Sequence, residues 1–222
     1  YMTQVSNPMT FDRCYITECT AHSAGGGVRI LQSTGVLFVN CLIACNEVEG
    51  KNAVYGGGVH ITTNSDGITF TNCTIADNSA ATTGSCNAIG GGIYFDSSSG
   101  KSLNLNNTII WGNSLSGGST NGVQLYATVT PTVYLDHCCY PGGAGEMVGN
   151  LVSTDCIHSD PEFNAPDYRL KSTSDCIDAG DNSLLPPNTV LDLDDNPRVV
   201  DGPDADTTAT VDMLSLIHIS EP

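Results

Sequence analysis

The sequence predicts an all-β fold, a right-handed parallel β-helix of about five coils, from three observations. A six-residue pattern bounded by large apolar residues recurs at steps of 27, 32, 35 and 30 residues. A glycine-rich pattern follows each of its first four copies. Between them the chain has neither a helical period nor hairpin dipeptides, which favours a solenoid of short strands. The right hand follows from the rule for parallel crossovers. The two patterns span residues 11–16, 38–43, 70–75, 105–110 and 135–140, and residues 25–30, 56–61, 90–95 and 121–125.

Stacking of such coils places equivalent residues in columns about 4.8 Å apart. We expect two inward apolar columns from the glycine-rich pattern. The first pattern carries an asparagine where the strand must bend, and asparagine tolerates the left-handed conformation of a bend. Two asparagine columns should therefore form side-chain ladders. The apolar columns are Val28, Val59, Ile93 and Val123, and Ile30, Ile61, Phe95 and Leu125; the ladders are Asn40, Asn72 and Asn107, and Asn46, Asn78 and Asn113.

The chain contains 10 cysteines, which raises the question of a disulfide framework. Four of them, Cys14, Cys41, Cys73 and Cys138, occupy one slot of the repeat, so we interpret them as small apolar core residues. The chain has no Cys-x-x-Cys pair with matching histidines, which argues against a zinc site, and no catalytic cysteine is expected. Cys156 and Cys176 lie outside the repeat, and a disulfide between them is left open.

Composition changes near residue 155. The net charge is −17, but 13 of the aspartates lie in residues 155–212, so the repeat region is nearly neutral. An acidic chain with 7 Lys and Arg lacks the clustered cations that nucleic acid or anionic membranes require. No apolar run approaches the ~18–20 residues of a membrane-spanning helix. We expect a β-helix over 1–154 and an acidic module over 155–213 that caps the open end of the solenoid.

The acidic module carries four segments that resemble the closing module of bacterial choice-of-anchor Q domain proteins. These segments are Asp160–Phe163, Asp167–Leu170, Ser174–Asp181 and Asp192–Arg198. The coils resemble generic parallel β-helix (PbH1, pectin lyase-like) repeats and, loosely, those of polymorphic outer-membrane proteins. The resemblance implies a bacterial protein, secreted or anchored at the cell surface, with its signal and anchor outside this fragment. Residues 214–222 are similar to a translated sequencing adapter, and we expect them to be foreign to the fold.

Two sets of residues are candidate sites. The outward residue after each glycine-rich element is Arg29, His60, Tyr94 and Gln124, a ladder along one sheet face. Such a ladder suits a glycan- or protein-binding face or a plain solvated one, and His60, Tyr94 and Arg29 are also a conceivable base, acid and uronate-neutralising set for β-elimination. The second set is Asp192, Asp194 and Asn196, whose alternating oxygens suggest a calcium (Ca²⁺) loop, although the glycine and glutamate of an EF-hand are absent.

We therefore predict a monomeric, non-catalytic stalk, adhesin or glycan-binding module, with glycans or surface proteins as partners. The alternative is a carbohydrate-active enzyme, a polysaccharide lyase, because parallel β-helices host such enzymes. An enzyme predicts a loop-walled groove over His60, with the insertion 78–89 as one wall, and a strongly shifted His60. A binding module predicts neither a shifted His60 in a cleft nor an unsaturated product.

Overall fold

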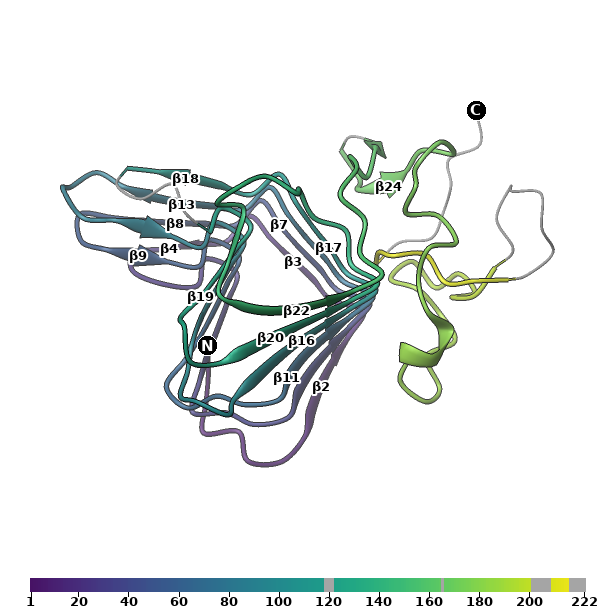
Figure 1. The fold of residues 1–222 in the computed structure, drawn as a ribbon, viewed down its shortest axis with the longest axis horizontal. Helices are drawn as coiled ribbons and strands as arrows, with labels where there is room; N and C mark the ends of the chain where they lie inside the picture. The colour runs from purple at the N-terminus through teal and green to yellow at the C-terminus, as the bar shows by residue number, and fades with distance from the viewer. Residues whose placement is uncertain (118–121, 165, 201–208, 216–222) are drawn as a thin grey trace.

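The computed structural model describes residues 1–117, 122–164, 166–200 and 209–215. The strands up to residue 154 form a stack of parallel coils with a triangular cross-section (Figure 1). The predicted parallel β-helix is confirmed. Two six-stranded parallel sheets form two sides of the triangle. Sheet A contains β1 (Met2–Thr3), β5 (Val28–Leu31), β10 (Val59–Thr62), β15 (Ile93–Asp96), β19 (Leu125–Ala127) and β21 (Met147–Val148). Sheet B contains β2 (Met9–Asp12), β6 (Val36–Val39), β11 (Ile68–Thr71), β16 (Ser102–Asn106), β20 (Thr132–Asp136) and β22 (Asn150–Thr154).

The third side, sheet C, has four strands, and a lateral arm projects from the triangle where sheets A and C approach each other (Figure 1). A small apolar cluster that includes Val48, Val54, Ala80 and Ala88 fills the arm. Sheet C contains β3 (Tyr15–Thr17), β7 (Leu42–Ala44), β12 (Thr74–Ala76) and β17 (Ile109–Trp111). The lateral arm contains a four-stranded sheet of β4 (Thr20–Ala21), β8 (Glu47–Gly50), β13 (Ser79–Thr82) and β18 (Ser114–Ser116). It also contains the pair β9 (Val54–Tyr55) and β14 (Ala88–Ile89).

Glycine triplets form the junction between the lateral arm and sheet A. In each, the first glycine has a positive φ, as at Gly56 (+65°), which side chains rarely adopt. A Cβ on the second glycine, Gly57, would overlap the carbonyl oxygens of Gly91 and Ser79. The triplets are therefore needed for close backbone approach between coils.

The core inside the triangle consists of columns of like residues. Phe11, Phe38 and Phe70 stack with ring centroids 4.9 and 4.6 Å apart. Leu105 and then Leu135 continue this column in the next coils. The predicted column of Ile30, Ile61 and Phe95 is also in register.

The repeated cysteines form another core column, as predicted. Each thiol donates to a carbonyl oxygen of the preceding coil: Cys41 to Phe11 at 3.4 Å, Cys73 to Phe38 at 3.5 Å and Cys138 to Leu105 at 3.1 Å. The hydroxyl of Thr108 takes the same role in the fourth coil, and Cys156 adds a further rung by donating to Leu135. All 10 cysteines are free thiols in this structure.

The ladder of Asn46, Asn78 and Asn113 is present at the junction of the lateral arm with the core. Asn78 Nδ2 donates to Asn113 Oδ1, and Asn46 Nδ2 donates to Asn78 Oδ1, both at 2.9 Å. The backbone N–H of each asparagine donates to the oxygen of the next rung as well, as Asn46 does to Asn78 at 3.0 Å. The ladder therefore ties neighbouring coils together through buried amides.

The other asparagine column lies at the corner between sheets B and C. Asn40, Asn72 and Asn107 adopt the predicted left-handed conformation, with φ of 52°, 51° and 45°. Their amides, however, mainly hold the C-terminal segment: they donate to the carbonyl oxygens of Leu191, Asp212 and Asp181 at 2.9, 3.1 and 3.0 Å. Within the column, only Asn107 to Asn72, at 3.5 Å, links two of these described side chains.

The acidic C-terminal segment lies along the side of the solenoid and not over its end, which differs from the expected cap (Figure 1). The outer face of sheet C is apolar, and the segment covers it, since Leu42, Ile109 and Cys139 share a buried cluster with Leu170 and Cys176. Phe163, Tyr168 and Ile177 pack against the same cluster. The segment contains the antiparallel pair β23 (Phe163–Asn164) and β24 (Arg169–Leu170) and the 3-10 helix η1 (Asn182–Leu184).

A buried arginine holds the end of the segment. Arg198 is fully buried and donates to the carbonyl oxygens of Asp212 at 2.8 Å and Leu214 at 2.5 Å. Burial lowers the pKa of Arg198 to about 10 and raises that of Asp212 to about 6. Leu214 and Ser215 are buried as well, although we expected residues 214–222 to be foreign to the fold. Residues 216–222 lie outside the described part of the chain, so the origin of this tail stays a prediction.

Candidate functional site

The predicted ladder lies on the outer face of sheet A, but its fourth member is wrong. Arg29, His60 and Tyr94 are direct neighbours in register on β5, β10 and β15. Tyr94 is paired with Tyr126 on β19, and not with Gln124. Likewise Leu125 pairs with Ile93, so the expected places of Val123 and Leu125 in the apolar columns are also wrong.

Gln124 is absent from the face because it serves the asparagine ladder instead. Its Oε1 accepts from Asn113 Nδ2 at 2.7 Å and from the Asn113 backbone N–H at 3.2 Å, and the side chain is buried. It thus takes the rung that an asparagine occupies in earlier coils. A shift of two residues keeps the inward–outward alternation of a strand. The pattern of apolar and polar residues therefore fits both registers.

Four aromatic rings form a continuous track on this face. Tyr55, from β9 in the lateral arm, lies 4.8 Å from Tyr94 and 6.0 Å from His60, measured between ring centroids. His60 and Tyr94 are 5.3 Å apart, and Tyr94 stacks on Tyr126 at 5.8 Å. We call these four residues the aromatic track. Tyr55 and Tyr126 are not among the residues predicted from the sequence, although Tyr55 directly precedes a glycine triplet.

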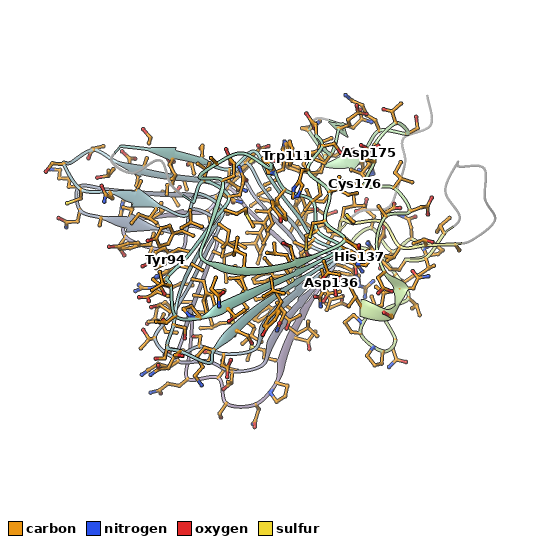
Figure 2. The ribbon with its side chains drawn as sticks, viewed as in Figure 1. Tyr94, Trp111, Asp136, His137, Asp175 and Cys176 are labelled. Atoms are coloured by element: carbon orange, nitrogen blue, oxygen red, sulfur yellow. The ribbon has the colours of Figure 1, made fainter. Side chains whose placement is uncertain are left out.

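The aromatic track borders an open cavity of about 390 Å³ between sheet A and the base of the lateral arm. Tyr94 lies on this side of the molecule, away from the C-terminal segment (Figure 2). Arg29 also lines the cavity, and its guanidinium carbon lies 5.5 Å from the ring centroid of Tyr1. The other lining residues are Ser23, Ala24, Leu31, Ala53, Thr62, Thr63 and Asp96. The expected groove over His60 therefore exists, but Ala53 and Tyr55 line it from the lateral arm, and the insertion 78–89 does not line it.

His60 is buried, with 6% of its surface exposed, and its Nδ1 has no hydrogen-bond partner among the described residues. Burial, with a smaller contribution from the Arg29 charge, lowers the pKa of His60 to about 4. Burial also raises the pKa of Tyr94 to about 12. Both side chains are therefore neutral near pH 7.

This electrostatic arrangement bears on the two functional alternatives. A cavity over a shifted His60 is the feature expected of an enzyme. The directions of the shifts, however, oppose proton transfer, because a general base or acid works best with a pKa near the operating pH. A base with a pKa of about 4 and an acid with a pKa of about 12 are both poorly matched to neutral solution.

The shifted pKa of His60 predicts a pH-dependent stability. The folded pKa of about 4 lies below the ordinary 6.5, so the unfolded chain binds a proton first as the pH falls. His60 thus contributes stability that is complete above pH 6.5 and is lost between pH 6.5 and 4. We expect the unfolding free energy of wild type, relative to His60→Gln, to fall across this window in urea titrations. The raised pKa of Asp212 makes the folded state more stable as the pH falls, which opposes the effect of His60. The test is therefore the difference in unfolding free energy between wild type and His60→Gln, and a difference that stays constant with pH would contradict the assignment.

The residues of the predicted calcium loop have partners within the protein. Asp192 Oδ1 accepts from the backbone N–H of Asp194 at 2.9 Å and of Asn196 at 2.8 Å. The Asp194 carboxylate accepts from the Tyr15 hydroxyl at 2.6 Å and pairs with Arg169. The contact with Tyr15 fastens the C-terminal segment to sheet C. Among the described residues, no group of three or more His, Cys, Asp or Glu side chains could hold a metal ion.

The fold defines a class, the parallel β-helix proteins. The chain belongs to the family described as "Right handed beta helix region", whose match covers residues 1–138. No curated protein and no solved structure matches the chain significantly. No helix among the described residues is long and apolar enough to span a membrane.

Proposed function

We propose that this chain is a glycan-binding module of an exported bacterial surface protein and that it does not turn its ligand over. The observation that carries the proposal is the aromatic track, in which His60, Tyr94 and Tyr126 follow one another from coil to coil and Tyr55 packs beside them at an open cavity. The face of a tyrosine ring is apolar and electron-rich, so it suits the C–H face of a sugar ring. Thr62, Asp96 and Arg29 supply hydrogen-bonding groups for the hydroxyls beside it.

The rest of the fold supports a binding surface held on a rigid scaffold. Parallel sheets run through the coils without interruption, and the cysteine column and asparagine ladder connect neighbouring coils. A site on strands is positioned more precisely than one on loops. The protein would act as a stalk or adhesin, as a monomer, with sugars or glycosylated surfaces as partners.

The cell-surface location rests on the resemblance of the C-terminal segment to choice-of-anchor Q modules. The segment covers the outer face of sheet C, which leaves sheet A accessible. We infer that the segment orients the solenoid relative to an anchor while the aromatic track faces outward. Fractionation of a native host, with antibody labelling of intact cells, tests this location.

Replacement of Tyr94 by alanine should strongly weaken glycan binding, because Tyr94 lies between Tyr55, His60 and Tyr126 and its loss interrupts the track. Tyrosines at the centre of an interface commonly contribute about 2 kcal/mol or more, so we expect an affinity loss of roughly 30-fold. The measurement is a glycan-array screen of wild type, followed by titration of Tyr94→Ala with the glycan found.

Tyr134→Ala is the matched control, since Tyr134 is a partly exposed tyrosine on the outer face of sheet B. It should bind like wild type. Equal losses in Tyr94→Ala and Tyr134→Ala, or no glycan bound at all, would contradict the proposal.

The lyase alternative is kept because the cavity places His60, Tyr94 and Arg29 together. Wild type is incubated with acidic polysaccharides, and the ultraviolet absorbance of an unsaturated product is followed. Product that accumulates with wild type and vanishes with His60→Ala would establish the enzyme and overturn non-catalytic binding. We expect binding without product.

A further inference from the structure

Two cysteines face each other across the boundary between the solenoid and its C-terminal segment. Cys139 continues the outer face of sheet C through bridges to Ile109 and Ile157. Cys176 belongs to the segment that covers this face. Both side chains are buried in one cluster with Leu170 and Met213. Figure 2 shows Cys176 at the boundary between the triangle and the segment.

The two thiols are neighbours within this buried cluster. The Cys176 thiol, followed by burial, raises the pKa of Cys139 far above its usual range. The sulfur of Cys139 also lies 3.4 Å from the carbonyl oxygen of Ser159, and the backbone of Cys176 accepts from the N–H of Met213 at 3.1 Å. The positions of both cysteines are therefore set by the packing around them.

Cys139 and its neighbour Cys138 lie on opposite faces of the coil. Cys138 points into the core, and Cys156 occupies the next rung of the same column. Their thiols point the same way, each to a carbonyl of the preceding coil, Leu105 and Leu135. Cys138 and Cys156 therefore stack in parallel within one column, whereas Cys139 and Cys176 approach each other from opposing surfaces, an arrangement that suits the geometry of a disulfide.

We propose that Cys139 and Cys176 are a disulfide-forming pair that covalently fastens the C-terminal segment to sheet C. This pairing replaces the one between Cys156 and Cys176 that the sequence left open, because Cys156 lies inside the core column. It does not depend on the proposed glycan binding.

Formation of this disulfide needs an oxidant. Oxidised glutathione or an exported thiol–disulfide oxidase supplies it. One cysteine thiolate attacks the oxidant's disulfide, forms a mixed disulfide and releases one reduced thiol. The second thiolate then attacks the protein sulfur and releases the other. The protein loses two protons and two electrons, and one oxidant disulfide becomes two thiols.

The test uses two preparations of the full chain. One is refolded from the reduced state in a glutathione redox buffer, and the other is the folded protein incubated with oxidised glutathione. Trypsin then releases residues 172–198, which contain Cys176 as their sole cysteine, and residues 102–169, which contain Cys138, Cys139 and Cys156. We expect these two peptides to be joined without reductant and separate with it. The link should be lost in Cys139→Ala and kept in Cys138→Ala and Cys156→Ala.

A second measurement addresses stability, and each variant is compared with itself before and after oxidation. A cross-link that closes the loop between Cys139 and Cys176 should raise the urea midpoint of wild type by roughly 1 M. Oxidation should leave the midpoint of Cys139→Ala unchanged. The proposal is overturned if the peptides remain separate in both preparations. It is equally overturned if the link survives Cys139→Ala or disappears in Cys156→Ala.

Discussion

Replacement of Asn78 by alanine should cost about 3–5 kcal/mol of unfolding free energy, since orphaned buried polar groups cost about 1–3 kcal/mol each and their effects overlap. Asn78 is fully buried. Its Oδ1 accepts from Asn46 N and Nδ2, and its Nδ2 donates to Asn113 Oδ1 and to the carbonyl of Ile43 at 2.9 Å. Alanine leaves all four groups without this partner, in a site where the backbone cannot move to replace it. Urea unfolding followed by circular dichroism measures the loss.

Asn52→Ala is the control, because Asn52 is exposed in the lateral arm and its change should stay within about 0.5 kcal/mol. We also expect Asn78→Ala to destabilise the lateral arm, since the ladder lies where the arm joins the core. Hydrogen exchange should increase in β8 and β13 first. A cost below 1 kcal/mol, on the order of a single exposed hydrogen bond, would show that the ladder does not tie the coils together.

Replacement of Phe70 by alanine should be about as destabilising, at about 3–5 kcal/mol, because it leaves a large cavity in a close-packed core. Phe70 is fully buried and stacks on Phe38, and Leu105 lies on its other side in the same column. Neighbouring coils are held in register by their backbone hydrogen bonds, so the column cannot collapse to fill the space. Urea unfolding again provides the measurement.

Phe70→Leu is the matched variant. Leucine already fills this slot at Leu105 and Leu135, so we expect a loss below about 1.5 kcal/mol. Similar losses for the alanine and leucine variants would contradict the cavity explanation and indicate that ring stacking dominates this column.

Much of the fold is predictable from the sequence because a solenoid repeats its chemistry. Successive coils present phenylalanine or leucine at one slot, asparagine at a second slot in three of the five copies, and cysteine or threonine at a third. The parallel register places equal slots on top of each other. The columns of Phe38 and Cys41, and the ladder through Asn78, all follow from that rule. The rule fails in the fourth coil, where the glycine triplet is weakened. Gln124 enters the asparagine ladder there, and Tyr126 takes the outward place that the repeat assigns to Gln124.

The candidate site was only half predictable for the same reason. Arg29, His60 and Tyr94 follow intact triplets, so their register was readable. Tyr55 comes from the lateral arm, and nothing in its local pattern shows that the arm folds back towards sheet A. The pKa of His60 also depends on burial by Tyr55 and Tyr94, which lie on different strands.

The sequence by itself determined the parallel β-helix, its core columns, the left-handed asparagine corners and the reduced cysteine column. Each of these depends on residues that recur at the same slot from coil to coil. Only the tertiary structure decided where the acidic C-terminal segment lies. An apolar strip on sheet C could be covered from the side, and three asparagine amides at the corner were available to bind its backbone. No repeat encodes that contact, since it joins residues that are 74 to 151 positions apart in the chain.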